Sequence, residues 1–142
     1  MKERKCCVLV IDGQGGQLGS HLIKGLQHLR DKLEIMAVGT NASASAAMLK
    51  AGADQAAAGE NPVVVACRKA DVIIGPIGIV IADAMLGEIT PKMATAVGQA
   101  DAVRILIPVN KCENLVAGIM HVPMAVLVQD AIAKLEKIAE TF

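Results

Sequence analysis

Strand-like and helix-like segments alternate along this 142-residue chain, and that alternation is the strongest constraint on its fold. Short apolar, β-branched runs occur at 5–12, 33–39, 71–75 and 102–110, and "ADQAA" at 53–57 predicts a weaker strand. This order is typical of strand–helix–strand units built around a parallel sheet. We therefore predict an α/β fold, a three-layer α/β/α arrangement with a mostly parallel sheet of about five or six strands.

Five segments are expected to form helices, namely 16–30, 41–52, 61–69 despite its run of valines, a segment that starts near Thr90-Pro91, and 125–140. Asn41 is the expected N-cap of the second helix and Gly52 its stop. The segment after residue 75 is harder to assign. Pro76 argues against extension of the preceding strand, and Gly78–Leu86 is expected to form a short apolar helix. "LVAGIM" at 115–120 is a candidate for a last strand.

Length and composition limit the class of protein. A chain of 142 residues fits one domain, 1–142. Acidic and basic residues balance at 14 each and Phe142 is the only aromatic residue, so nucleic acid is not an expected partner. The longest apolar run, 72–82, is about half of the roughly 20 residues that a membrane-spanning helix needs. Without a signal-peptide pattern, we expect a cytoplasmic protein with no membrane partner.

The four cysteines show no CxxC spacing and are expected to be reduced thiols. Cys6 and Cys7 should point to opposite faces of a strand that is buried on both sides. Cys112, which follows Lys111 in a loop, is a weak candidate for a reactive thiol. A loop thiol without function is the simpler interpretation.

A glycine cluster joins the first predicted strand to the first predicted helix. Gly13, Gly16 and Gly19 are spaced GxxGxxG, with Gln14 and Gly15 between the first two. In a Rossmann turn, glycines reverse the chain and allow backbone N–H groups to approach a phosphate. The helix start adds about half a positive charge. The cluster predicts a site for a phosphate-bearing ligand, and the alternative is a purely structural turn.

The cofactor stays open between NAD(P) and another nucleotide. The dinucleotide form GxGxxG is not met, because Leu18 stands where a count from Gly13 and Gly15 requires glycine. At the end of the second strand, Thr40 and Asn41 can bond a ribose or phosphate, whereas NAD sites usually offer Asp or Glu there. The spacing resembles that of short-chain dehydrogenases locally, but the chain has no tyrosine for their catalytic pair.

A second glycine-rich loop, "GPIG", follows the strand at 71–75. The carboxyl ends of parallel strands face the crevice in which such folds bind ligands, so Gly75 and Pro76 are predicted beside the base or reactive end of the ligand. The alternative is that they only redirect the chain. Glu60 and Asn61 are expected to cap a helix rather than to join this rim.

Other polar residues give weaker signals. Glu88 and Lys92 can face the crevice, although interaction with a helix dipole and water is the simpler interpretation. His21 and His28 lie roughly 10 Å apart along one helix, so they cannot share a metal, and we expect no metal site. No Ser or Cys stands in a nucleophile motif, and whether the protein is an enzyme stays open.

Five stretches together resemble one family, namely "IDGQGGQLG", "GTNASASAAMLKAGAD", "GENPVV", "ADVIIGPIGIVIADAMLGEITPKMA" and "ILIPVNKC". The chain is similar over nearly its whole length to short single-domain proteins found largely in anaerobic Firmicutes, a bacterial family described only as a domain of unknown function. The resemblance implies a Rossmann-like fold. It implies no activity and carries no catalytic residue over to this chain.

Two hypotheses for function follow. The first is a cytoplasmic Rossmann-like protein that binds a nucleotide, dinucleotide or other phosphate-bearing ligand at the Gly13–Gly19 turn, with the backbone of Gly13–Gly16 on the phosphate. The second is a structural or regulatory homo-oligomer, with a dimer favoured, in which the turn binds no ligand. This hypothesis rests on the apolar segment 75–87, which can pack against a second copy of the chain.

Overall fold

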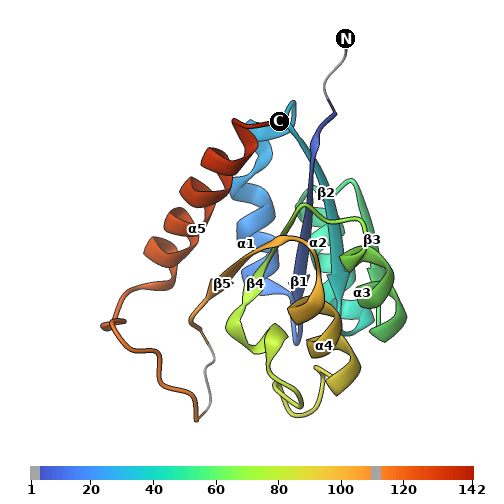
Figure 1. Ribbon diagram of the computed structural model, residues 1–142, viewed down its shortest axis with the longest axis vertical. Coiled ribbons are helices and arrows are strands. Elements are labelled where there is room, and N and C mark those ends of the chain that lie inside the picture. Colours follow the sequence, from blue (N-terminus) through green and yellow to red (C-terminus); the bar gives the residue numbers. More distant parts are fainter. Residues whose placement is uncertain (1–3, 110–112) are drawn as a thin grey trace.

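The computed structural model describes residues 4–109 and 113–142, which form a parallel sheet between two layers of helices (Figure 1). The strands are β1 (Cys6–Asp12), β2 (Leu33–Gly39), β3 (Gln55–Ala58), β4 (Val72–Pro76) and β5 (Val103–Ile107). Their order is β3-β2-β1-β4-β5, and every pairing is parallel. This is the dinucleotide-binding order rather than the flavodoxin-like one, so the predicted α/β fold is confirmed as Rossmann-like.

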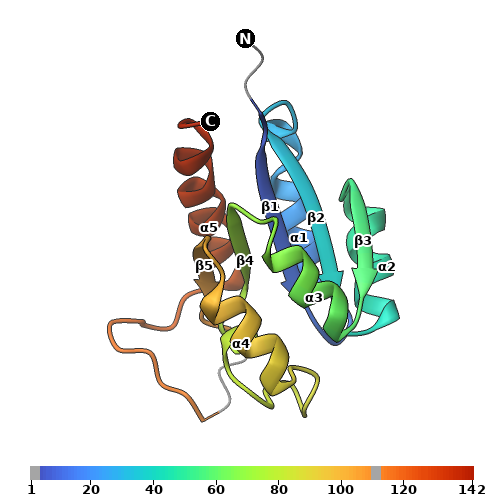
Figure 2. The same cartoon turned by 45° about the vertical axis from the view of Figure 1, so that its right-hand side comes forward.

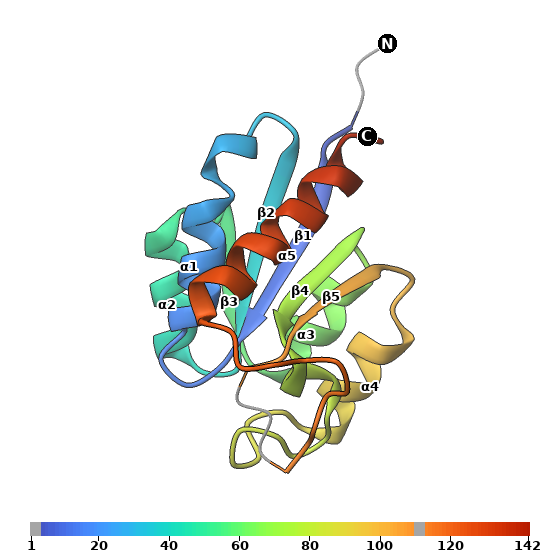
Figure 3. The ribbon, with the colours of Figure 1, turned by 90° about the vertical axis from the view of Figure 1, so that its left-hand side faces the viewer.

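Five α-helices cover the two faces of the sheet. They are α1 (Gln17–Gly25), α2 (Ala42–Ala51), α3 (Glu60–Cys67), α4 (Pro91–Gln99) and α5 (Met124–Ala139). The 3₁₀ helices η1 (Gln27–Leu29) and η2 (Ile77–Val80) follow α1 and β4. Helices α3 and α4 pack on one face (Figure 2). Helices α1, α2 and α5 pack on the other (Figure 3).

The central strand β1 is buried along its whole length, and its side chains alternate between two apolar cores. Cys6, Val8 and Val10 face α1 and α5, whereas Cys7 and Leu9 face α3 and α4. A strand covered on both faces favours apolar residues on both of them, which explains the unbroken apolar run 6–11 that precedes Asp12. The opposite orientations of Cys6 and Cys7 are confirmed, and burial raises the pKa of both thiols to about 11.

Helices α2 and α4 begin at side-chain caps that the sequence displays. The Asn41 side chain accepts a hydrogen bond from the Ala44 N–H at 2.8 Å, and Gly52 ends α2 with φ 121°. Thr90 caps α4 through the Met93 N–H at 3.1 Å. These predicted boundaries are confirmed.

The connection between β4 and α4 differs from the prediction. No α-helix covers 78–86: the 3₁₀ helix η2 includes only residues 78–80 of this segment, and the chain then makes tight turns in which Asp83, Met85 and Leu86 have positive φ values of 67°, 59° and 56°. Pro76 belongs to β4, where it is paired with Ile107. Strand β1 pairs with β4 only as far as Ile74, so the missing N–H of proline costs no hydrogen bond to β1.

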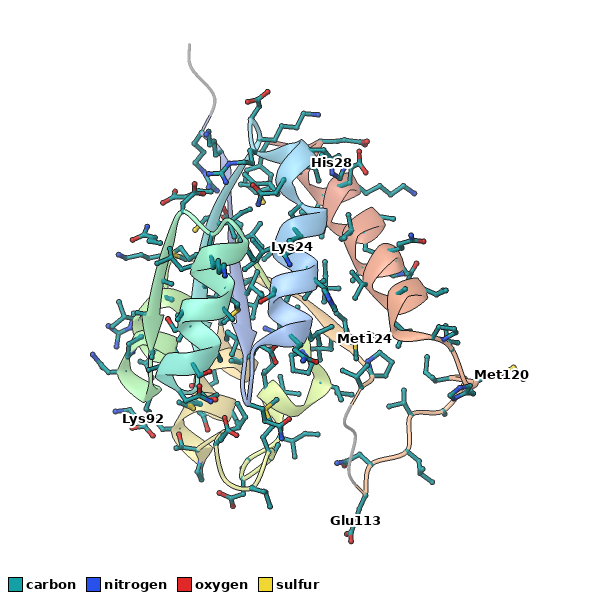
Figure 4. All side chains as sticks on the ribbon, turned by 180° about the vertical axis from the view of Figure 1, so that it is seen from behind. Lys24, His28, Lys92, Glu113, Met120 and Met124 are labelled. Carbon is teal, nitrogen blue, oxygen red and sulfur yellow. The ribbon has the colours of Figure 1, made fainter. Side chains whose placement is uncertain are left out.

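The predicted strand at 115–120 is also wrong. Residues 113–123 form an irregular arm that leaves the body of the molecule, as the labelled Glu113 and Met120 show (Figure 4). Gly118, with φ 82°, lies in a turn in the middle of this segment. The candidate thiol Cys112 lies outside the described residues. Among the described helices, none has both the length and the apolarity needed to cross a membrane.

The two ends of the described chain meet at the amino ends of the strands (Figure 1). The Arg4 guanidinium donates to both carboxylate oxygens of Asp71, at 2.7 and 2.9 Å. It also lies 4.9 Å from the centroid of the Phe142 ring. Asp71 accepts a third hydrogen bond from the Cys7 N–H at 2.8 Å, so one carboxylate joins the start of β1 to the start of β4.

Candidate functional site

The glycine turn and the end of β2 lie side by side at the carboxyl edge of the sheet. Asp12 and Gly39 are paired at the ends of β1 and β2, which brings the next residues of both strands together. The Thr40 N–H donates to the Asp12 carbonyl at 3.0 Å, and the Asn41 side-chain amide donates to the Gln14 carbonyl at 3.0 Å. The structure therefore places the residues predicted for phosphate and ribose next to one another.

The turn itself is held by backbone conformations that favour glycine. The Gly16 N–H donates to the Gly13 carbonyl at 2.9 Å, and Gly16 has φ 73°. A Cβ on Gly16 would lie 2.9 Å from the backbone of Ala44 in α2. A Cβ on Gly19 would overlap the Met48 sulfur of the same helix. Gly16 and Gly19 thus allow α1 to begin close to α2.

A buried carboxylate that the sequence analysis did not select stabilises this turn. Asp12 is 6% exposed, and its two oxygens accept hydrogen bonds from the N–H groups of Gly13 and Gly19, each at 2.8 Å. Burial raises the pKa of Asp12, although these hydrogen bonds oppose that shift. Asp12 therefore binds an amide from the first turn of α1 and also fixes the reversal of the chain.

A second carboxylate reaches the turn from the connection between β4 and α4. One oxygen of Glu88 accepts hydrogen bonds from the Thr40 hydroxyl at 2.5 Å, the Gln14 N–H at 2.9 Å and the Asn41 side-chain amide at 3.0 Å. The hydrogen bond from Thr40 is the main cause that lowers the pKa of Glu88. Of the two interpretations of Glu88, the structure supports the one in which it faces the crevice.

Two backbone N–H groups of the turn have no hydrogen-bond acceptor within the described part of the chain. Among residues 4–109 and 113–142, no acceptor bonds the N–H of Gly15 or that of Gln17, the first residue of α1. Both residues are exposed. A Cβ on Gly15 would meet no heavy atom within 4 Å, so the space above this residue is open. Over Gly13, by contrast, the sulfur of Met85 would lie 2.7 Å from such an atom.

The predicted residues at the end of β4 have a packing role in this structure. Gly75 and Pro76 are buried, and a Cβ on Gly75 would overlap the carbonyl oxygen of Ile11. The absence of a side chain at Gly75 lets β1 and β4 approach closely. The contact of Gly75 and Pro76 with a ligand stays a prediction.

The other polar candidates lie away from the turn. Gly59, rather than Glu60 or Asn61, is the N-cap of α3, and the Glu60 carboxylate accepts a hydrogen bond from Thr90 at 2.6 Å. The capping prediction is therefore wrong. Lys92 is exposed at the start of α4 and points outward (Figure 4). Within the described ranges, no three His, Cys, Asp or Glu residues are grouped as a metal site would require.

A sizeable surface depression lies elsewhere on the molecule. It has a volume of about 730 Å³, lies between α3 and α4, and includes the exposed cations Arg68 and Lys92. None of the residues predicted for the ligand lines it. Volume alone does not identify a site, so the convergence of donors and acceptors at the glycine turn is the stronger indication.

The strand order, the glycine turn and the helix that follows it define a Rossmann-like α/β protein. Within that class, the chain belongs to the family described as a domain of unknown function, DUF3842, whose model matches residues 7–140. No curated protein matches the chain. The match confirms the part of the resemblance that concerns a single-domain family of unknown function.

Proposed function

We propose that this protein binds a nucleotide, a dinucleotide or another phosphate-bearing ligand at the Gly13–Gly19 turn. The observation that carries the proposal is that the backbone N–H groups of two exposed residues, Gly15 and Gln17, have no acceptor among the described residues. They lie at the start of α1, where the helix dipole favours an anionic oxygen. The neighbouring Thr40 and Asn41 would then contact the ribose.

The proposal extends to the setting of the protein but not to a reaction. We place it in the cytoplasm of a bacterium, with NAD(P) or another nucleotide as its cofactor. The two carboxylates nearest the turn, those of Asp12 and Glu88, are both engaged in hydrogen bonds. An enzyme built on this turn would complete its site with residues from a partner subunit.

The first test uses the absence of tryptophan and tyrosine from the chain. The freshly purified, desalted protein should absorb almost nothing near 280 nm, a wavelength set by the chemistry of those two side chains. A nucleobase band that is released on denaturation and identified by mass spectrometry would support the proposal. A featureless spectrum, followed by no thermal shift with common nucleotides, would favour the purely structural turn.

The second test places a charge at the rim of the turn. The space above Gly15 is open, so Gly15→Asp should fold while its carboxylate repels a phosphate. Gly15→Asn has nearly the same shape without the charge and serves as the matched control. We expect nucleotide binding to weaken at least about tenfold more in the Asp variant than in the Asn variant. Equal binding by both variants would contradict a phosphate at this rim.

The second candidate function, a homo-oligomer, draws support from a different surface from the one that the sequence suggested. Ile79 is fully buried within the subunit, so the segment 75–87 does not present it to a partner. The arm 113–123 and the start of α5 instead expose apolar side chains: Leu115 is 95% exposed, Met120 82% and Val126 50%. Exposed apolar patches of this kind favour contact with another protein surface.

Size-exclusion chromatography with light scattering tests this second candidate. We expect Leu115→Ser combined with Met120→Ser to shift an oligomer to the monomer without loss of helix content. Lys137→Ser, on the exposed side of α5, is a control that changes no apolar side chain. A wild-type chain that is monomeric at all concentrations would rule this candidate out.

A further inference from the structure

We infer that Glu88 determines the specificity of the turn, selecting a ligand that presents a free ribose hydroxyl and rejecting one that carries a phosphate at the same position. In terms of cofactors, NAD-type ligands are favoured over NADP-type ligands. This inference rests on the proposed function, because it concerns the part of the same ligand that lies next to the phosphates.

The first argument is the position of the Glu88 carboxylate. Dinucleotide sites usually offer an acid to the ribose 2′-hydroxyl at the end of the second strand. Here β2 continues into Thr40 and Asn41, neither of which is acidic. The Glu88 oxygen lies 2.5 Å from the Thr40 hydroxyl and 3.0 Å from the Asn41 amide. The connection after β4 therefore delivers the carboxylate that β2 itself lacks.

The second argument is that buried neighbours and backbone hydrogen bonds hold the segment that carries Glu88 in position beside the turn. Its neighbour Ile89 is 1% exposed and Met85 is 8% exposed, so both anchor the connection in the core between the sheet and α4. The Asp83 N–H donates to the Ile89 carbonyl at 2.7 Å, and the Ile89 N–H donates to the Ala84 carbonyl at 3.1 Å. A ligand at the turn consequently meets this carboxylate in place.

The third argument is charge. The hydrogen bond from Thr40 lowers the pKa of Glu88, so the group is ionised at neutral pH. One of its oxygens takes all three hydrogen bonds, and the other has no partner among the described residues. No Lys or Arg pairs with Glu88 there, and residues 40–49 contain no cation that would hold a phosphate. A free, charged acceptor binds a hydroxyl donor and repels a phosphate.

The test compares NAD⁺ and NADP⁺ by isothermal titration calorimetry on the full chain. We expect the wild type to bind NAD⁺ at least about tenfold more tightly than NADP⁺. Glu88→Gln keeps the shape and one acceptor oxygen but removes the charge. In this variant NAD⁺ should bind about tenfold more weakly, and the ratio between the two ligands should fall to about threefold or less. Glu136→Gln, on the exposed side of α5, is the matched control and should behave as the wild type does.

Each other result has a definite meaning. If Glu88→Gln strengthens the binding of NAD⁺, NADP⁺ and inorganic pyrophosphate alike, the carboxylate competes with phosphate and the inference is overturned. An unchanged ratio would overturn it while leaving nucleotide binding intact. If circular dichroism shows that Glu88→Gln does not fold, the affinities of the wild type for NAD⁺ and NADP⁺ decide. Equal affinities for the two ligands would then overturn the inference. If neither the wild type nor any variant binds a nucleotide or pyrophosphate, the proposed function and this inference both fail.

Discussion

Two connections leave the sheet at the same edge, and each brings a carboxylate to the glycine turn, but they do so by different means. The connection after β1, residues 12–19, contains Asp12 together with the Gly13 and Gly19 amides that it binds. The connection after β4, residues 77–90, contains Glu88, whose partners lie 47, 48 and 74 residues away in the sequence. The first is a local structure, whereas the second depends on the complete fold.

The difference separates stability from recognition. Asp12 is almost fully buried and its hydrogen bonds hold the turn in shape, so its removal should destabilise the protein. Glu88 is partly exposed, and one of its oxygens joins the turn to the residues that follow β2. Its removal should therefore mainly change which ligands bind at the turn. Four predictions test this comparison.

The largest expected effect is that of Asp12→Ala on stability. The change leaves the buried N–H groups of Gly13 and Gly19 without their acceptor, and hydrogen bonds to a charged group are worth about 1.5–3 kcal/mol each. We expect the free energy of unfolding to fall by about 3–5 kcal/mol, measured by urea denaturation followed by circular dichroism. Asp12→Asn, which keeps one acceptor oxygen, should lose less. A loss below about 1 kcal/mol in the Ala variant would show that Asp12 is not needed for the turn.

The next effect comes from one methyl group added to each of two neighbouring glycines. In Gly13→Ala the new Cβ would lie 2.7 Å from the Met85 sulfur and 2.8 Å from the Thr40 hydroxyl oxygen, whereas Gly15→Ala meets open space. Overpacking should cost about 1–3 kcal/mol in the first variant, and the second should stay within about 0.5 kcal/mol of the wild type. Equal stabilities would mean that the connection after β4 does not rest on the turn.

A smaller effect is the pH dependence of stability, which should have opposite signs for the two carboxylates. The pKa of Glu88 is lowered from its ordinary value of 4.5, so its contribution to stability is complete above that pH and is lost as the pH falls through the lowered value. The pKa of Asp12 is raised from 3.8, so protonation favours the folded state and its contribution grows as the pH falls toward 3.8.

Urea denaturation between pH 7 and pH 3 measures both signs. The stability difference between the wild type and Glu88→Gln should shrink as the pH falls below about 4.5, whereas the difference between the wild type and Asp12→Asn should grow. Two differences that move in the same direction would contradict the environments assigned to the two groups.

The smallest expected effect lies at the tip of the connection after β4. Leu86 is 103% exposed and has φ 56°, a conformation that asparagine tolerates better than leucine. Leu86→Asn should therefore raise the free energy of unfolding slightly, by up to about 0.5 kcal/mol, and leave ligand binding unchanged. A destabilised variant whose stability varies with protein concentration would instead show that Leu86 packs against a second copy.

Much of the fold could be predicted because short stretches of sequence determine it. Apolar runs indicated the strands, and the Asn41 cap, the Gly52 stop and the Thr90–Pro91 start defined helix ends within a few residues. The segment 78–86 could not be predicted in this way. Its apolar composition suggested a helix, but tertiary packing of Ile79 and Met85 favoured turns in which non-glycine residues adopt left-handed conformations.

In the candidate site too, the features set by local sequence could be predicted and those set by tertiary contacts could not. The glycine spacing and the polar residues Thr40 and Asn41 could be read from the sequence, because each directly follows a recognisable strand. Asp12 was missed although it is adjacent to Gly13, since an acid at a strand end does not show whether it is buried. Glu88 was left with two interpretations, because no local pattern connects it with a turn 74 residues earlier.

The contact between Arg4 and Phe142 offers a spectroscopic use. Phe142 is the only phenylalanine in the chain, so ring-labelling with ¹³C yields the NMR signal of a single residue. That ring lies at the amino edge of the sheet, whereas the glycine turn lies at the carboxyl edge (Figure 1). A ligand or variant that acts only at the turn should leave this resonance in place, and one that loosens the whole sheet should shift it. The protein therefore carries its own remote reference signal for every experiment on the turn.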